Sequence, residues 1–251
     1  MSYVRLEHGF KKFGRQGGAP PLEVLRDFNL SLRQGEFVSV IGPSGCGKST
    51  LFRLLAGMEV LDGGQLFLQG QQVKGLGQLV AYMPQQDMLM PWRTVVGNAV
   101  LGLELDGVSL PQAREAALKM LPDFGLESFG DALPRELSGG MRQRVALLRT
   151  MLPGRPILLL DEPLGALDSI TRHKMQLWLL DVWEKYRPTV LLVTHDVEEA
   201  IFMSDRVYVL SPRPASVKLE LQVDLPRPRN RESLTEEAFL SLKKEILKVL
   251  A

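Results

Sequence analysis

The segment GPSGCGKST, residues 42–50, contains the residue types that proteins use to hold a chain of phosphates. It fits the pattern G-x-x-x-x-G-K-[ST], with Gly42, Gly47, Lys48 and Ser49 at the defined positions. The glycines let backbone N–H groups close around phosphate oxygens, the ammonium adds positive charge, and the serine hydroxyl is a ligand for Mg²⁺. We therefore expect this loop to bind a nucleotide. Its other members are Pro43, Ser44, Gly45, Cys46 and Thr50.

The flanking residues predict the elements that position this loop. The apolar run from Phe37 to Ile41 predicts a strand before it, and the amphipathic stretch from Lys48 predicts a helix after it. Cys46, the one cysteine in the sequence, is interpreted as a small filler of the loop rather than a redox group. A single cysteine excludes an internal disulfide and suits the cytosol.

Two adjacent carboxylates follow a second apolar run. The run ILLL, residues 157–160, predicts a buried parallel strand that delivers Asp161 and Glu162 at its carboxyl end. We expect Asp161 to hold Mg²⁺ through a water and Glu162 to polarise the water that attacks the γ-phosphate. A helix-capping acid would explain one carboxylate but not two. A third run, TVLLVTH, predicts a strand that ends in His195, interpreted as a γ-phosphate sensor, with a structural or surface histidine as the alternative.

Residues 137–144, LSGGMRQR, provide a second place for a phosphate. Ser138, Gly139 and Gly140 precede a stretch with two arginines that predicts a helix. Exposed N–H groups at a helix N-terminus bind anions. The chain therefore carries two sets of phosphate-binding residues.

With LSGGMRQR, LLLDEP, GALD and VTHD, the chain resembles the nucleotide-binding subunits of ATP-binding cassette (ABC) transporters over nearly all of its 251 residues. Kinases and GTPases with the same phosphate loop lack LSGG. The resemblance implies the ABC ATPase fold, hydrolysis of ATP and a requirement for Mg²⁺. It also implies a homodimer in which ATP is clamped between the phosphate loop of one subunit and Ser138, Gly139 and Gly140 of the other.

Three further residues receive roles from this resemblance. Gln85 matches the glutamine that links Mg²⁺ with the transmembrane subunit, and Gln86 takes the place where related chains often have Glu. Asp168 matches the aspartate that communicates between the two nucleotide sites, and it can also cap the helix that follows it. Phe13 matches the aromatic residue that stacks on adenine, with Phe10 as a competitor.

The predicted elements indicate an α/β protein. Its P-loop NTPase core has a mostly parallel sheet, an antiparallel β portion at the N-terminus and an inserted α-helical subdomain. We expect a single ABC ATPase domain, 1–251, with a core lobe at about 1–85 and 154–225. The helical subdomain lies at about 86–153, and a tail with a helix at about 226–251.

The two helices outside the motifs have recognisable starts. Ser109 with Gln112, and Ser233 with Glu236, have the spacing of capping boxes. The apolar stripe of the last helix predicts packing on the chain's own core rather than binding to a separate regulator. This stripe consists of Phe239, Leu242, Ile246 and Leu250.

Composition narrows the class of partner. Thirty basic and 29 acidic residues give a formal net charge of +1, without the basic excess of a nucleic-acid binder. The apolar runs are far shorter than the ~20 residues of a spanning helix, so any transmembrane permease must be a separate subunit. A cluster of methionines surrounds Gln85 in the sequence. Because methionine side chains are flexible, they suit a surface that re-packs during a motion, which favours contact with the permease here. The alternative is that they fill the core. The cluster consists of Met83, Met88, Met90 and Trp92.

Within the family, MPW, EPLGALD and the LSPRPASV…LPRPR tail resemble the nitrate/sulfonate/taurine importer group, which includes thiamine-precursor importers. This implies a bacterial subunit on the cytoplasmic face of the inner membrane, paired with a permease and an extracytoplasmic solute-binding protein. One alternative is a soluble ABC-class ATPase of DNA repair or translation, a class that usually has two cassettes, a coiled coil or basic extensions. Another is a regulator that no longer hydrolyses ATP, against which Glu162 and His195 argue.

Overall fold

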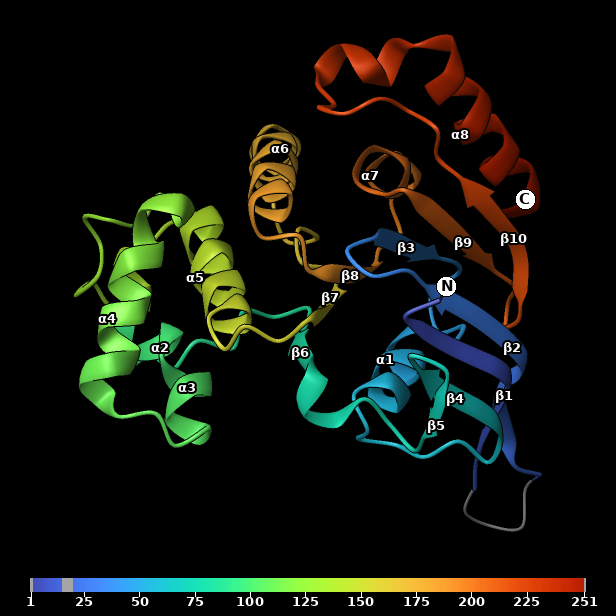
Figure 1. Ribbon diagram of the computed structural model, residues 1–251. Coiled ribbons are helices and arrows are strands. Elements are labelled where there is room, and N and C mark those ends of the chain that lie inside the picture. Colours follow the sequence, from blue (N-terminus) through green and yellow to red (C-terminus); the bar gives the residue numbers. More distant parts are fainter. Residues whose placement is uncertain (1, 15–19, 251) are drawn as a thin grey trace. The chain divides into compact units, whose positions relative to one another are not determined.

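The computed structural model describes residues 2–14 and 20–250. The chain forms two units (Figure 1). Unit 1 comprises Met1–Val80 and Arg187–Ala251, and unit 2 comprises Ala81–Tyr186. Each unit has its own strands, helices and buried residues.

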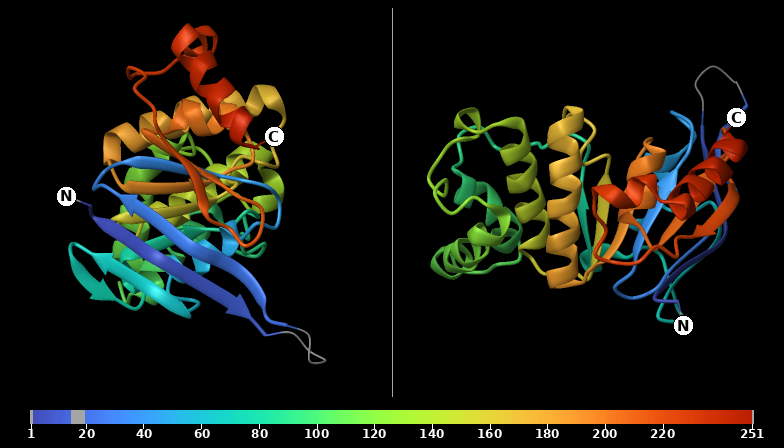
Figure 2. Two further views of the ribbon diagram at one scale, coloured as in Figure 1. Left: turned by 90° about the vertical axis from the view of Figure 1, so that its right-hand side faces the viewer. Right: turned by 90° about the horizontal axis from the view of Figure 1, so that it is seen from above.

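Unit 1 contains a four-stranded antiparallel sheet. Its two long strands lie side by side (Figure 2), with Val4 opposite Leu32 and Leu6 opposite Leu30. Val4 and Leu6 are buried and Arg5 between them is exposed, because successive side chains of a strand point to opposite faces. In sheet order the strands are β2 (Leu22–Leu32), β1 (Val4–Phe13), β4 (Gly63–Leu68) and β5 (Gln71–Val73).

Unit 1 also contains mostly parallel strands. The strand β3 pairs in parallel with β8 on one side and with β9 on the other, and β10 pairs antiparallel with β9. Both β3 and β8 are buried along their whole length, as expected for apolar strands covered on both faces. The bounds are β3 (Phe37–Ile41), β8 (Thr189–Val193), β9 (Arg206–Leu210) and β10 (Val217–Gln222).

The helices of unit 1 follow its strands. The last helix, α8, contacts α7, β9 and β10, and it buries Phe239 and Ile246. The expected packing of this helix on the chain's own core is therefore confirmed. The helices are α1 (Lys48–Leu55), α7 (Val197–Met203) and α8 (Glu237–Leu250), with 3₁₀ turns η2 (Gly77–Leu79) and η5 (Arg231–Thr235).

Unit 2 is mainly helical. Its strands β6 (Val80–Met83), which begins at the last residue of unit 1, and β7 (Ile157–Asp161) are neighbours. The Trp178 ring packs edge-on against Phe124, with centroids 5.4 Å apart, and Arg144 stacks on its face. The helices are α2 (Val95–Ala99), α3 (Leu101–Leu105), α4 (Leu110–Met120), α5 (Gly139–Met151) and α6 (Ser169–Tyr186), with turns η3 (Leu121–Phe124) and η4 (Pro134–Glu136).

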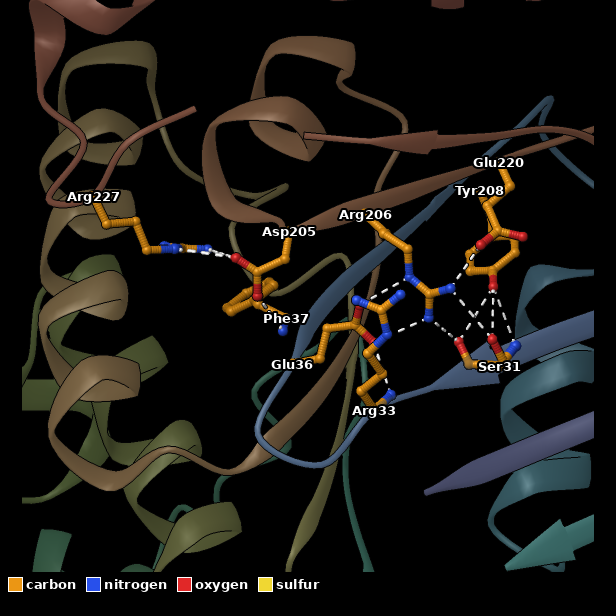
Figure 3. A network of polar contacts seen from close by, with 9 residues as sticks. All are labelled: Ser31, Arg33, Glu36, Phe37, Asp205, Arg206, Tyr208, Glu220 and Arg227. Atoms are coloured by element: carbon orange, nitrogen blue, oxygen red, sulfur yellow. Dashed lines mark hydrogen bonds and ion pairs between the residues drawn. The ribbon is translucent and has the colours of Figure 1, made fainter. Parts of the chain in front are cut away.

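A buried ionic network fixes the starts of β3 and β9 (Figure 3). Arg206 is 5% exposed and Glu36 is 6% exposed. Arg206 Nε donates to Glu36 Oε1 at 2.8 Å, and Arg206 Nη1 donates to Glu220 Oε1 at 2.6 Å. Next to it, Asp205 accepts from the backbone N–H of Phe37 at 2.9 Å. A charge can stay buried here because its hydrogen-bonding groups have partners.

The first expected capping box differs from the observed contact. Ser109 directly precedes α4, as predicted, but its hydroxyl donates to the Gln112 side chain at 2.6 Å. The Ser109 side chain therefore accepts no cap hydrogen bond from the helix backbone. The predicted capping box is wrong because the Ser109 and Gln112 side chains form a hydrogen bond with each other.

The second expected capping box is also wrong. Ser233 lies inside η5, and α8 begins only at Glu237. The Asn230 side chain accepts from the N–H groups of Glu232 and Ser233. Because asparagine is a strong N-cap, the chain turns three residues earlier than the Ser233–Glu236 pair predicted.

The Pro/Arg-rich segment after β10 is anchored in unit 1. Arg229 is buried, and its Nη1 donates to the carbonyls of Ile201, Phe202 and Ser204 at 2.9, 3.0 and 2.7 Å. These carbonyls end α7 and lack helical partners of their own. Burial lowers the pKa of Arg229 to about 10, aided by the nearby charge of Arg227.

Candidate nucleotide-binding site

The phosphate loop connects β3 to α1 in unit 1. Gly47 caps α1 with φ of 134°, a backbone conformation that residues with a side chain rarely adopt. A Cβ atom on Gly47 would lie only 2.9 Å from Val24 Cγ1. Glycine is therefore required, and the loop occupies a strand end and a helix N-terminus, where anions bind.

Lys48 is a buried cation inside this loop. Lys48 is 8% exposed, and its Nζ donates to Gly42 O at 2.8 Å and to Pro43 O at 3.1 Å. Among the described residues of unit 1, no carboxylate pairs with it. Burying an ammonium without a counter-charge is costly, so an anionic ligand would stabilise it.

The other loop residues differ in accessibility. Cys46 is a buried free thiol, as its interpretation as a filler predicts, and its N–H donates to Pro43 O at 3.2 Å. Ser44, Gly45 and Ser49 are exposed, and Thr50 is half-buried. Ser49 is thus accessible to a cation at the start of α1.

His195 reaches the same sheet edge as the phosphate loop. Val40 of β3 is paired with Val193 of β8, and the N–H of Thr194 donates to Val40 O at 3.2 Å. Both strands end within the next residues, so His195 leaves β8 beside the start of the loop. Its side chain is exposed. This position at the carboxyl end of parallel strands is where α/β proteins bind ligands.

Phe13 is the last residue of β1 and is half-buried. The ammonium of Lys11 lies 5.0 Å from the centroid of its ring. Phe10, the competing aromatic residue, is half-buried opposite Gly63. The assignment of Phe13 to adenine stays a prediction.

Unit 2 brings three of the predicted residues together at the end of β7. Gln85 Nε2 donates to Glu162 Oε2 at 3.2 Å, and the hydroxyl of Tyr82 donates to Asp161 Oδ2 at 3.1 Å. Glu162 has φ of 45°, which is unusual for a residue with a long side chain. Such strained backbones concentrate at functional sites.

Asp168 caps α6, as the sequence predicted. Its Oδ1 accepts from the N–H groups of Ile170 and Thr171 at 3.1 and 3.0 Å. Hydrogen bonds from the Thr171 side chain and backbone lower the pKa of Asp168. The carboxylate is therefore charged at neutral pH.

Ser138 caps α5, with its Oγ accepting from the N–H of Met141 at 3.3 Å. Gly139 and Gly140 form the first turn of that helix. A Cβ on Gly140 would lie 3.4 Å from Thr171 Cγ2 of α6. The second set of phosphate-binding residues therefore lies at a helix N-terminus, next to α6.

Sequence reasoning missed two arginines of α5 that hold the loop after Gln85. Arg142 Nε pairs with Asp87 Oδ2 at 3.2 Å. Arg149 donates to Met88 O at 2.8 Å and to Asp87 O at 2.5 Å. Residues seven apart lie on one face of a helix, which is the signal that the sequence offered.

The methionine cluster divides between two roles. Met83 is 1% exposed and fills the interior, whereas Met88 is 61% and Trp92 74% exposed. Met90 is half-buried. Core filling is therefore correct for Met83, and the exposed Met88 and Trp92 leave an apolar surface beside Gln85.

The donor types proposed for Mg²⁺ are chemically suitable. Mg²⁺ prefers hard oxygen ligands and keeps several waters. The hydroxyl of Ser49, the amide oxygen of Gln85 and the carboxylate of Asp161 are such ligands. In unit 2, Gln85 uses its nitrogen on Glu162, which leaves its oxygen as the remaining acceptor.

Comparison with known proteins agrees with these features. The family described as "ABC transporter" matches residues 25–165. An uncharacterized ABC transporter ATP-binding protein of Methanocaldococcus jannaschii is 46% identical, covering 91% of this chain and 85% of the relative. The nitrate import ATP-binding protein NrtD of Synechocystis is 44% identical, covering 82% and 79%. The aliphatic sulfonates import ATP-binding protein SsuB of Bacillus licheniformis is 40% identical, covering 95% and 90%.

Solved structures show the same fold. The dimeric structure of a bacterial ABC transporter cassette has a TM-score of 0.74 and 30% identity, covering 89% of this chain and 100% of the cassette. That cassette is also known as a dimer in a post-hydrolysis state bound to ADP and Pi. The predicted α/β class and ABC ATPase fold are confirmed. None of the helices in the described residues has the length and apolar character that crossing a membrane requires.

Proposed function

Because this chain belongs to the ABC transporter family and is an ABC-type ATPase, we propose that it energises import of a small solute across a membrane. The solute is of the nitrate, sulfonate, taurine or thiamine-precursor type. Relatives named as nitrate and aliphatic sulfonate import proteins support this class. The subunit acts at the cytoplasmic face of the bacterial inner membrane.

The observation that carries the nucleotide site is the buried ammonium of Lys48, held on loop carbonyls without a carboxylate partner in unit 1. Phosphates of ATP supply the missing negative charge, and the N–H groups of residues 42–50 surround them. Phe13 stacks on adenine. Mg²⁺ neutralises phosphate charge when bound, with Ser49, Gln85 and Asp161 as its protein partners.

Glu162 is the general base in this proposal. Its carboxylate polarises the attacking water, and its contact with Gln85 orients it. His195 senses the γ-phosphate from the edge of the parallel sheet. Asp168 communicates between the two nucleotide sites from its position at the start of α6.

The working form is a homodimer. Each ATP lies between the phosphate loop of one subunit and Ser138, Gly139 and Gly140 of its partner, where the positive end of the α5 dipole faces the γ-phosphate. A dimeric cassette with 30% identity supports this arrangement. The single ABC ATPase domain then consists of a core lobe (1–85 and 154–225), a helical subdomain (86–153) and a tail (226–251).

The exposed Met88 and Trp92 beside Gln85 are the surface for the transmembrane permease. The permease receives its solute from an extracytoplasmic binding protein, which this chain contacts only indirectly. Nucleic acid has no role.

The test is purification of the complex from the native membrane. We expect the chain to co-purify with a multispanning protein and a binding protein whose bound molecule, identified by mass spectrometry, is nitrate, a sulfonate, taurine or a thiamine precursor. ATPase activity should rise when the loaded binding protein is added to the complex in vesicles. Recovery of an active ATPase from the cytosol without any membrane protein would instead favour a soluble ABC-class ATPase.

A further inference from the structure

The turn between β9 and β10 brings an arginine to the phosphate loop. Arg213 Nε donates to the carbonyl oxygen of Gly45 at 2.9 Å, and Arg213 Nη2 donates to the same oxygen. None of the motifs that define the nucleotide site includes this turn. Gly45 lies near the middle of the loop and has φ of 72°.

The turn that carries Arg213 is held by its own hydrogen bonds. Ser211 Oγ donates to Pro214 O at 3.1 Å and accepts from the N–H of Ser216 at 2.9 Å. The N–H of Ser211 donates to Ser216 O at 3.0 Å. Since both ends of the turn are closed in this way, the Arg213 backbone has a defined position.

Strand β2 holds the same turn against the phosphate loop. The N–H of Ala215 donates to Val24 O at 2.8 Å, and the N–H of Arg26 donates to Ala215 O at 3.0 Å. Val24 is also the residue against which Gly47 is packed. One segment of β2 therefore supports both the loop and the turn.

The parallel sheet brings the two segments to one edge. Ile41 of β3 is paired with Val209 of β9, so the loop and the turn leave neighbouring strands at their carboxyl ends. A Cβ on Gly42 would lie 2.9 Å from Leu210 Cβ. The approach of Arg213 to Gly45 thus follows from strand register.

Arg213 and Lys48 bind different carbonyl groups of the loop. Lys48 binds the carbonyls of Gly42 and Pro43, and Arg213 binds that of Gly45. Arg213 is exposed and pairs with no carboxylate among the described residues of unit 1. Its positive charge therefore stays beside the loop.

We propose that Arg213 is a positioning residue for the phosphate loop. By binding Gly45 O it fixes the peptide between Gly45 and Cys46, and it adds positive charge where the phosphates bind. The inference rests on the proposed nucleotide site. Because the contact of Arg213 is with a carbonyl of the phosphate loop, it acts on nucleotide affinity and leaves turnover nearly unchanged.

The experiment compares Arg213→Ala, Arg213→Gln and Arg213→Lys in the full chain. A fluorescent ATP analogue gives the dissociation constant at 0.1 and 0.5 M salt, and steady-state phosphate release gives KM and kcat. For Arg213→Ala we expect affinity to fall about 3- to 10-fold, as for a charged hydrogen bond partly screened by solvent. At high salt the fall should become smaller, because the exposed charge is screened, but the part due to the hydrogen bond with Gly45 should remain. The kcat should stay within about twofold, and Arg213→Lys should recover part of the affinity.

Two controls make the result decisive. Arg5→Ala removes the same charge from an exposed arginine of unit 1 that pairs with Glu7, and it should bind the analogue like wild type. The melting temperature without nucleotide should be unchanged in Arg213→Ala to within about 1 °C, below the shift of about 2–4 °C that a 1 kcal/mol loss causes in a chain of this size. Wild-type affinity in Arg213→Ala, an equal loss in Arg5→Ala, or a loss explained by lower melting temperature would each overturn the proposal.

Lys48→Ala separates this inference from the proposed nucleotide site. If Lys48→Ala abolishes binding while Arg213→Ala binds like wild type, only the role of Arg213 is wrong. If Lys48→Ala binds the analogue like wild type, the phosphate loop itself is not the binding site.

Discussion

At the scale of single residues, two of the predicted residues are held in costly arrangements. The ammonium of Lys48 is buried on carbonyl groups, and the backbone of Glu162 has a positive φ. Each arrangement costs free energy. An anionic ligand would offset the cost at Lys48, and strained backbones such as that of Glu162 concentrate at functional sites. Gln85 donates a hydrogen bond to the Glu162 carboxylate. We interpret this as preorganisation of the water-activating group.

Glu162→Gln tests that interpretation. The amide keeps the size and a hydrogen-bonding oxygen, so ATP affinity should stay within a few-fold of wild type. Turnover should fall by about 10²–10⁴, the range for losing a general base. Phosphate release and binding of a fluorescent ATP analogue measure the two quantities. Turnover within threefold of wild type would remove Glu162 from the catalytic role.

At the scale of elements, the helix α5 contributes in two places, at its N-terminus and along one side. Its N-terminus presents Ser138, Gly139 and Gly140, and its side holds the loop at Asp87 and Met88 through Arg142 and Arg149. Burial lowers the pKa of Arg149, and the charge of Asp87 opposes that shift. We therefore expect a displacement of the loop that carries Gln85 to be transmitted to α5 through the contacts of these two arginines.

Arg149→Ala should weaken coupling more than basal hydrolysis. The variant removes two hydrogen bonds to loop carbonyls and leaves the phosphate loop and Glu162 intact. Transport by the assembled complex should fall by about 2- to 30-fold, the range of coupling energies carried by such contacts. ATPase of the isolated subunit should change less.

The matched control for this comparison is Arg114→Ala. Arg114 is an exposed arginine of unit 2 that pairs with Asp131 in the described structure. It should leave both assays near wild type, because exposed ion pairs contribute little. Equal losses of transport and ATPase in Arg149→Ala would show that Arg149 only stabilises the fold.

At the scale of the whole molecule, charged groups join the two sheets of unit 1. Arg206 on β9 contacts Ser31 on β2, Glu36 before β3 and Glu220 on β10 (Figure 3). The hydroxyl of Tyr208 contacts the carbonyl of Ser31 at 3.2 Å. These contacts link strands that are distant in the sequence, so the network reports on the tertiary structure of unit 1.

Arg206→Met should destabilise the chain strongly. It leaves the buried carboxylate of Glu36 without its ion-pair partner, and such losses cost about 3–5 kcal/mol of the free energy of unfolding. Urea unfolding followed by circular dichroism measures the effect. Arg5→Ala, which breaks an exposed pair, should cost at most about 1 kcal/mol. Equal effects would contradict a stabilising role for the buried network.

The proposed homodimer leads to a prediction that requires two different variants in one dimer. Ser138→Arg should block the N-terminus of α5, and Lys48→Ala should disable the phosphate loop, so each variant alone should be nearly inactive. In a covalently linked dimer with one change per subunit, shared sites place both lesions in one site and leave the other intact. ATPase should then recover to at most about half of wild type, by counting intact sites.

The linked dimer requires two checks. The Ser138→Arg subunit must still bind the ATP analogue, and linkage must be verified on a denaturing gel. Under those conditions, a complete lack of recovery would count against ATP bound between two subunits, because each subunit would then carry a broken site of its own.

Much of the site was predictable from sequence because its parts are local. The phosphate loop, the carboxylates that end β7 and the residues that begin α5 are each defined by neighbours in the chain. Backbone conformation and helix capping depend on such neighbours, so Gly47, Asp168 and Ser138 were expected where they are found. The capping box at Ser233 failed because Asn230, also local, caps an earlier turn, and the Ser233 hydroxyl accepts from the N–H of Asn230.

Tertiary structure alone decided what the arginines do. Arg206 meets Glu36 across 170 residues of chain, Arg213 meets Gly45 across 168, and Arg149 meets Asp87 across 62. In the sequence an arginine indicates an exposed charge, since most arginines lie at the surface. Only strand register and helix packing bring a particular carbonyl or carboxylate within reach, and those depend on contacts that no local pattern contains.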